Sequence, residues 1–162
     1  MTPTPSAVHA AHDAWLADSI ATLEAGVESA KDGMRVDGDH RPASRGERGA
    51  VSAQGALRAG LLARIAELTA ARQQLAALDS DAERPRVCLG ALVQVEDEDG
   101  AASWLAILPG GQGSPLPVGG GPVRVVSLDA PIARALLGRE EGDVVELVRP
   151  SGEVELEVLS VC

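Results

Sequence analysis

The sequence predicts an α+β protein built from two domains. Residues 1–80 are expected to form an antiparallel α-helical coiled-coil hairpin, and residues 86–162 a small antiparallel β domain with one helix. Apolar residues recur at helical spacing in the first half, whereas the second half holds short, valine-rich segments that alternate in polarity. Glycine and proline gather between those segments, as is typical of turns. A length of 162 residues suits one or two domains.

Two apolar stripes predict the helices of the hairpin. The stronger stripe steps by three, four or seven residues and contains a strict heptad at Leu61, Leu68 and Leu75. A weaker stripe runs through residues 8–27. Glycines and a proline interrupt the helical pattern between them, which places the tip of the hairpin near residues 33–48. Two helices of similar length joined by one polar stretch most simply pair antiparallel.

The second half predicts five strands and a helix. The strands are expected at residues 87–95, 102–108, 123–127, 144–148 and 154–159. A short helix is expected at 131–137, stopped by Gly138. The glycine- and proline-rich residues 109–122 are expected to form a long loop.

Charge and composition argue against several functions. The chain has 14 lysines and arginines against 24 aspartates and glutamates, so a broad basic face for nucleic acid is not expected. Two tryptophans are the only aromatic residues, which leaves no platform for stacking bases. No histidine follows His40, so neither Cys88 nor Cys162 has a base in the β domain for nucleophilic catalysis. We therefore do not expect an enzyme.

The sequence also gives an expectation for location and assembly. The N-terminus lacks the basic and apolar regions of a signal peptide, and no apolar run is long enough to span a membrane. We expect a cytoplasmic protein. A monomer is expected, because the hairpin can bury its own apolar stripe.

A specific motif lies in residues 123–159. After a strand, residues 129–138 read Asp-Ala-Pro-Ile-Ala-Arg-Ala-Leu-Leu-Gly, and a Gly-Asp pair and a Pro-Ser-Gly-Glu turn follow. This order and spacing resemble the C-terminal domain of the Gre transcript cleavage factors (GreA/GreB). The N-terminal half is similar to that family in architecture and length. The resemblance implies an FKBP-like fold for the β domain.

The resemblance also implies a partner and a mechanism. The β domain would dock on bacterial RNA polymerase, at the rim of the secondary channel, through Asp129, Ala130, Pro131 and Ile132. The hairpin would enter the channel and bring acidic residues to the nascent RNA 3′ end, where they help to hold a Mg²⁺ shared with the polymerase active site. Hydrolysis of a phosphodiester by two metals benefits from such extra carboxylate oxygens. The polymerase would then cleave the backtracked RNA, and the protein would be its activator.

The tip departs from the family pattern, which has Asp and Glu three residues apart. Counted from the second helix, the Glu falls on Glu47 but the Asp falls on Ser44. A second register makes Asp39 the first acid and needs a four-residue insertion. The candidate metal ligands at the tip are Asp37, Asp39 and Glu47. The candidate contacts with RNA phosphate or polymerase acids are Arg41, Ser44, Arg45 and Arg48.

Each candidate also has a purely structural explanation. Asp37 and Asp39 suit a turn with local backbone bonds, and Glu47 suits the first turn of a helix. Residues 129–132 suit the start of a helix. Residues 31–48 carry five basic and four acidic side chains, and this field does not favour Mg²⁺. The predicted function is stimulation of transcript cleavage, and the alternative is a secondary-channel regulator that does not support cleavage.

Overall fold

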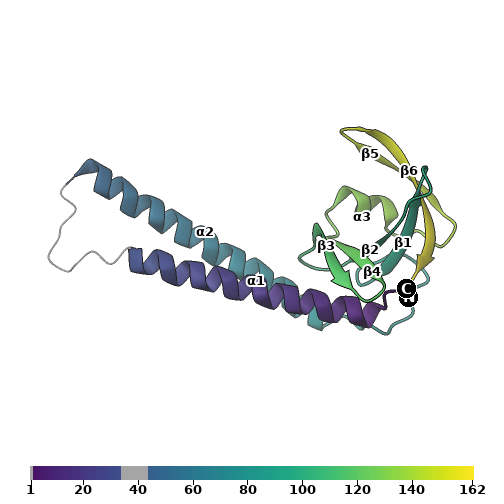
Figure 1. Cartoon of the computed structure of the whole chain (residues 1–162), viewed down its shortest axis with the longest axis horizontal. Coiled ribbons are helices and arrows are strands. Elements are labelled where there is room, and N and C mark those ends of the chain that lie inside the picture. Colours follow the sequence, from purple (N-terminus) through teal and green to yellow (C-terminus); the bar gives the residue numbers. More distant parts are fainter. Residues whose placement is uncertain (1, 34–43) are drawn as a thin grey trace. The chain divides into compact units, whose positions relative to one another are not determined.

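The computed structural model describes residues 2–33 and 44–162, and it confirms the predicted fold class. A helical hairpin precedes a β domain with one helix (Figure 1). The elements, in chain order, are α1 (Pro5–Gly33), α2 (Arg45–Ala76), β1 (Leu92–Asp97), β2 (Ala102–Ile107), β3 (Gln112–Val118), β4 (Gly121–Val126), α3 (Pro131–Leu136), β5 (Val144–Arg149) and β6 (Gly152–Val161). None of the helices described is both long and apolar enough to cross a bilayer.

The chain forms two compact units. The hairpin unit spans Trp15–Ala70, and the second unit combines Met1–Ala14 with Ala71–Cys162. The first turns of α1 and the last turn of α2 therefore belong with the β domain, whereas the sequence placed the domain boundary in the linker at residues 81–85.

The hairpin unit is held by a narrow aliphatic seam. Leu16 and Leu68 are fully buried, and a Cβ on Gly26 would lie 3.4 Å from Leu61 Cδ1, so α1 and α2 approach closely there. Leu57 continues the predicted stripe but is 57% exposed.

Three glycines inside α2 give a stability prediction. A Cβ at Gly49, Gly55 or Gly60 would meet nothing within 4 Å, and none of the three has positive φ. A glycine inside a helix costs roughly 0.5–1 kcal/mol relative to alanine. We expect the triple alanine variant to raise the free energy of unfolding of the hairpin by about 2 kcal/mol, measured by urea titration with circular dichroism. Gly26→Ala is the comparison, because its methyl would contact Leu61 Cδ1 at 3.4 Å, so packing adds to the helix effect there. A triple variant no more stable than the parent would contradict the prediction.

The β domain contains one six-stranded sheet in the order β3-β4-β2-β1-β6-β5. Neighbouring strands run antiparallel except β2 and β4, which run parallel, so the sheet is mixed. The loop predicted for residues 109–122 is wrong, because β3 lies within it. The strand was not predicted because it contains Pro115 and Pro117, and proline usually argues against a strand. Prolines are tolerated there because β3 is an edge strand.

An aliphatic core fixes α3 on one face of this sheet. Ala133 and Leu136 of α3 are fully buried against the strands. The helix ends as predicted, with Gly138 at φ +77° in the left-handed region. The strand residues of this core are Val93, Val95, Leu105, Ile107, Val126, Val145, Leu147, Leu156 and Val158. This packing holds the loop before α3 in a defined position.

Candidate functional site

The predicted docking residues lie where β4 leads into α3. The N–H of Ala130 donates to the carbonyl of Ser127 over 3.1 Å, which closes a tight turn before the helix. The side chain of Asp129 is 93% exposed and lies 3.8 Å from Arg134 Nη2, a surface ion pair that contributes little to stability. Pro131 is exposed at the first turn of α3. Ala130 and Ile132 are half-buried and pack against the core. Asp129 and Pro131 are thus open to a partner, while their neighbours anchor the segment.

Leu128 is a surface residue that the sequence reasoning missed. Leu128 and Asp129 occupy the two central positions of the turn from Ser127 to Ala130. The Leu128 side chain is 38% exposed although it is large and apolar. Only its position in the sequence, just after a predicted strand and before Asp-Ala-Pro, could have indicated that this leucine lies in an exposed turn. We define Leu128, Asp129 and Pro131 as the docking edge.

At the tip, Ser44 and Glu47 form a reciprocal cap at the start of α2. The N–H of Glu47 donates to Ser44 Oγ over 3.2 Å, and the N–H of Ser44 donates to Glu47 Oε2 over 3.3 Å. This capping box satisfies two backbone donors that a helix start leaves open. Arg45 and Arg48 are exposed on the same turn. Glu47 therefore lies in the first turn of α2, as expected, and its carboxylate also caps that helix, which was not expected.

The other tip candidates, Asp37, Asp39 and Arg41, lie outside the described residues. Within residues 2–33 and 44–162, no group of three or more His, Cys, Asp or Glu side chains is arranged to hold a metal ion. Of the predicted Mg²⁺ ligands, only Glu47 is described, and its carboxylate already accepts a backbone hydrogen bond. Metal sharing at the tip stays a prediction.

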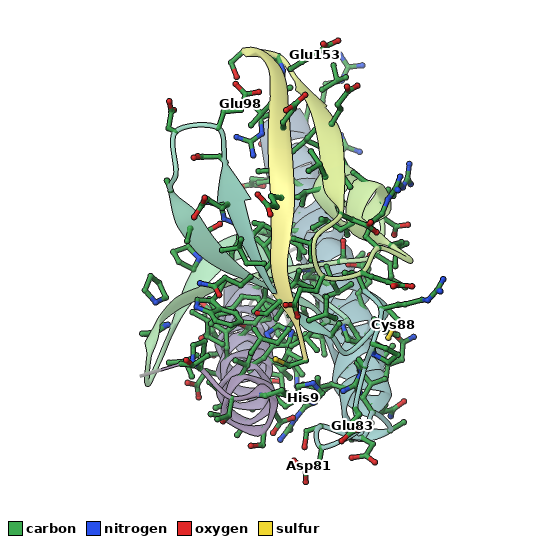
Figure 2. All side chains as sticks on the ribbon, turned by 90° about the vertical axis from the view of Figure 1, so that its right-hand side faces the viewer. His9, Asp81, Glu83, Cys88, Glu98 and Glu153 are labelled. Atoms are coloured by element: carbon green, nitrogen blue, oxygen red, sulfur yellow. The ribbon has the colours of Figure 1, made fainter. Side chains whose placement is uncertain are left out.

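Two histidines pack the start of α1 into the β-domain unit. His12 is 2% exposed, and its Nε2 lies 2.8 Å from the carbonyl oxygen of Pro109. A carbonyl only accepts, so this nitrogen carries the proton. Burial lowers the pKa of His12, with the Pro109 carbonyl and Asp13 partly opposing that effect. Burial is also the main cause that lowers the pKa of His9. Figure 2 labels His9 beside Asp81 and Glu83 at the lower end of this view.

The lowered pKa values of His9 and His12 predict that the free energy of unfolding decreases as the pH falls. The unfolded chain binds protons on His9 and His12 near the ordinary pKa of about 6.5, whereas the folded chain binds them only at lower pH. Their contribution is fully present above that value and is lost as pH falls from about 6.5 toward the folded pKa. We expect the urea midpoint to fall between pH 8 and pH 5.5. Replacing both histidines with glutamine should flatten this dependence, and an unchanged slope would contradict it.

An ion pair between Asp13 and Arg72 adds a second contact between α1 and α2. Arg72 donates through Nε to Asp13 Oδ1 over 2.7 Å and through Nη2 to Oδ2 over 3.0 Å. The hydrogen bonds from Arg72 hold the pKa of Asp13 below its ordinary value. The geometry is bidentate, which is the strongest form of this pair. Both side chains are partly exposed, so the contribution to stability stays modest.

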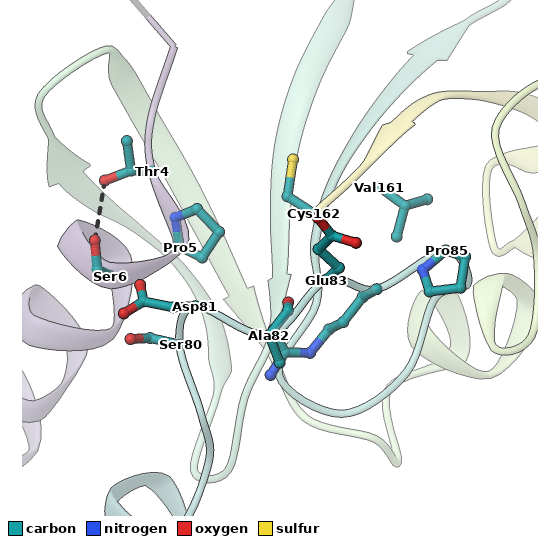
Figure 3. A pocket seen from close by; sticks show the side chains of 11 residues that line it. Thr4, Pro5, Ser6, Ser80, Asp81, Ala82, Glu83, Pro85, Val161 and Cys162 are labelled. Carbon is teal, nitrogen blue, oxygen red and sulfur yellow. Dashed lines mark hydrogen bonds between the residues drawn. The ribbon is translucent and has the colours of Figure 1, made fainter.

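A hollow of about 800 Å³ lies between the start of α1, residues 80–85 and the end of β6 (Figure 3). Arg84 lines it, but the guanidinium donates to the carbonyls of Ala82 and Asp79. Cys162 is the only thiol among the lining residues, and no histidine lines the hollow beside it. The Cys162 thiol therefore has no imidazole beside it among the lining residues.

Comparisons with known proteins identify the β domain. The family model described as "Transcription elongation factor, GreA/GreB, C-term" matches residues 82–162, which is half of the chain. Transcription elongation factor GreA of Verminephrobacter eiseniae is 38% identical over 76 residues, 47% of this chain and 45% of that protein. GreA of Sulfurovum sp. is 39% identical over 92 residues, 56% of this chain and 54% of that protein. The chain thus spans about half the length of these curated relatives.

Solved structures resemble the chain more loosely. GreA factor homolog 1 (Gfh1) of Thermus thermophilus is 21% identical, with 93% of this chain and 94% of that chain covered at a TM-score of 0.39. Gfh1 of Thermus aquaticus is 20% identical, with 99% and 97% covered at a TM-score of 0.40. The assignment therefore rests on the match of residues 82–162 to the family model. The chain belongs to the GreA/GreB family of transcription elongation factors.

Proposed function

We propose that this protein binds bacterial RNA polymerase at the secondary channel and modulates elongation from there. The observation that carries the proposal is the family match over residues 82–162, which contains the exposed turn with Asp129 and Pro131. The docking edge contacts the rim of the channel, and the hairpin enters it. α2, with 32 residues, is about 48 Å long.

The capping box supports a modulator that does not stimulate transcript cleavage. Glu47 is the acid that the family register places at the tip, and its carboxylate accepts the N–H of Ser44. The neighbouring Arg45 and Arg48 oppose the binding of a cation there. Cleavage stimulation is the second candidate function, favoured by the acids at Asp37 and Asp39 in the sequence. In that case these residues share Mg²⁺ with the polymerase active site.

A backtracked elongation complex distinguishes these functions. The full chain is added to the complex with cognate polymerase, and both RNA cleavage and elongation rate are measured. We expect binding and altered elongation without increased cleavage. We also expect Glu47→Gln to behave like the parent, because glutamine can replace glutamate in a capping box while removing its charge. Ser44→Ala is the matched control, since it removes one bond of the cap and keeps the carboxylate.

Other outcomes would overturn parts of the proposal. Cleavage that is stimulated by the parent and lost in Glu47→Gln, but kept in Ser44→Ala, would make Glu47 a metal ligand. Cleavage lost in Asp37→Asn or Asp39→Asn would assign that role to those residues. A chain that does not bind polymerase would contradict the proposed partner.

A further inference from the structure

The solvent face of β5, β6 and β1 concentrates negative charge. We define the acidic sheet face as Glu96, Glu146, Glu153, Glu155 and Glu157. Glu146 lies directly opposite Glu155, and Glu96 directly opposite Glu157. Like charges in these positions destabilise a sheet. None of the ion pairs found among the described residues involves a carboxylate of this face, so the repulsion is not relieved there.

A small hollow opens within this face. It has a volume of about 120 Å³ and is lined by Glu96, Asp97, Glu98, Val144, Glu155 and Glu157. Glu98 Oε1 accepts the N–H of Glu155 over 3.1 Å, so one of the carboxylates has a local partner. In Figure 2, Glu98 and Glu153 appear toward the same end of the β domain. The remaining acids leave a hollow suited to the charged end of a basic side chain.

The neighbouring edge of the sheet offers main-chain hydrogen bonds. β5 is the last strand of the sheet, and a two-residue turn pairs Arg149 with Gly152. The N–H of Val158 donates to the carbonyl of Asp143 over 2.8 Å. In an antiparallel pair, every second residue of a strand directs its main-chain N–H and C=O toward the partner strand, and this bond fixes which residues of β5 do so. The main-chain groups of Val144, Glu146 and Val148 therefore point away from β6, toward the open edge.

The side chains of this edge are unusual for a surface strand. Val144 is 54% exposed and Val148 is 72% exposed, on either side of Glu146. β3, the opposite edge, carries two prolines, whereas β5 has none. Proline is a common means of blocking strand addition at an edge. The β5 edge is thus open, partly apolar and bordered by acids.

We propose that the β5 edge and the acidic sheet face together bind an extended polypeptide segment with lysine or arginine at every second position. The segment adds as a further strand beside β5, and its main chain pairs with Val144, Glu146 and Val148. Its basic side chains lie on the same face as Glu146 and Glu155 and offset the repulsion between them. A second copy of this chain is a poor occupant, since pairing two β5 edges would bring like-charged Glu146 side chains together. This surface is separate from the docking edge, so the inference does not rest on the proposed function.

The probe is the peptide acetyl-Lys-Val-Lys-Val-Lys-Val-Lys-amide, titrated into the full chain at low salt. One control peptide has glutamate for lysine, and another groups the four lysines before the three valines. We expect the alternating peptide to bind, and to slow amide hydrogen exchange at Val144, Glu146 and Val148. Both control peptides should bind at least tenfold more weakly.

Variants of the chain test the acidic sheet face and the β5 edge separately. Glu146→Gln with Glu155→Gln should weaken peptide binding about tenfold, and it also removes a repulsive pair, so the fold should be kept. The matched control is Glu24→Gln with Glu83→Gln, which changes net charge equally at exposed positions outside the sheet. Val148→Pro should also weaken binding, because it removes an N–H that points to the open edge.

Three outcomes would overturn the inference. One is equal binding of the alternating and grouped peptides, which would indicate charge attraction without strand addition. Another is unchanged exchange at β5 during binding. The last is self-association through β5 in the absence of peptide, which would make a second copy the occupant.

Discussion

Leu128→Asp is expected to weaken binding of RNA polymerase by about thirtyfold without unfolding the protein. Leu128 is held at the centre of the turn from Ser127 to Ala130, and its side chain is 38% exposed. An apolar anchor at the centre of an interface contributes about 2 kcal/mol or more when removed, and aspartate also adds a charge to be desolvated. The substitution leaves the buried core untouched, because α3 is anchored by Ala133 and Leu136. Binding of fluorescently labelled protein to core polymerase measures the effect.

Leu137→Asp is the matched control for this prediction. Leu137 is 39% exposed and lies at the other end of α3, so it differs from Leu128 in place more than in exposure. We expect this variant to bind polymerase nearly as well as the parent. Asp129→Ala and Pro131→Ala should each weaken binding, by less than Leu128→Asp. Equal losses at Leu128 and Leu137 would show that the docking edge has been placed wrongly.

Much of the fold could be predicted because local chemistry and tertiary structure agree. The alternation of residues 144–148 and 154–159 matches β5 and β6, and Gly152 has the positive φ that their turn requires. β3 could not be predicted, because prolines usually argue against a strand. β3 pairs with β4, the next strand in the chain, and β4 is held in the sheet by its parallel pairing with β2. The prolines fit because the other side of β3 is the open edge of the sheet.

The candidate site was predicted only where the motif is local. Asp129 and Pro131 could be proposed because they belong to a contiguous segment with a definite pattern, and their role in docking stays a prediction. Leu128 was not predicted, because its 38% exposure depends on the folded turn and not on its neighbours in the sequence. The buried contact of His12 with Pro109 joins residues far apart in the chain, so spacing alone gave no sign of it. Glu47 had two interpretations in the sequence, and the structure supplies the cap.

Gly111→Ala is expected to reduce the free energy of unfolding of the β-domain unit by about 3 kcal/mol. A Cβ at Gly111 would lie 2.5 Å from the carbonyl carbon of Val126 and 2.8 Å from the nitrogen of Ser127. These are main-chain atoms, so a change of rotamer cannot relieve the clash. The chain passes this closely because residues 108–111 turn beside the end of β4. Urea unfolding compared with Gly119→Ala, whose methyl meets nothing within 4 Å, measures the effect.

The same substitution links the fold to the docking edge. Val126 and Ser127 lead directly into the turn that presents Leu128 and Asp129, so relief of the clash must shift that turn. Gly111→Ala should therefore weaken polymerase binding even at temperatures where the protein stays folded, while Gly119→Ala should not. Normal binding by a folded Gly111→Ala variant would show that the position of this turn does not control docking. A loss confined to Gly111→Ala would show that the close approach at the end of β4 sets the geometry of the docking edge.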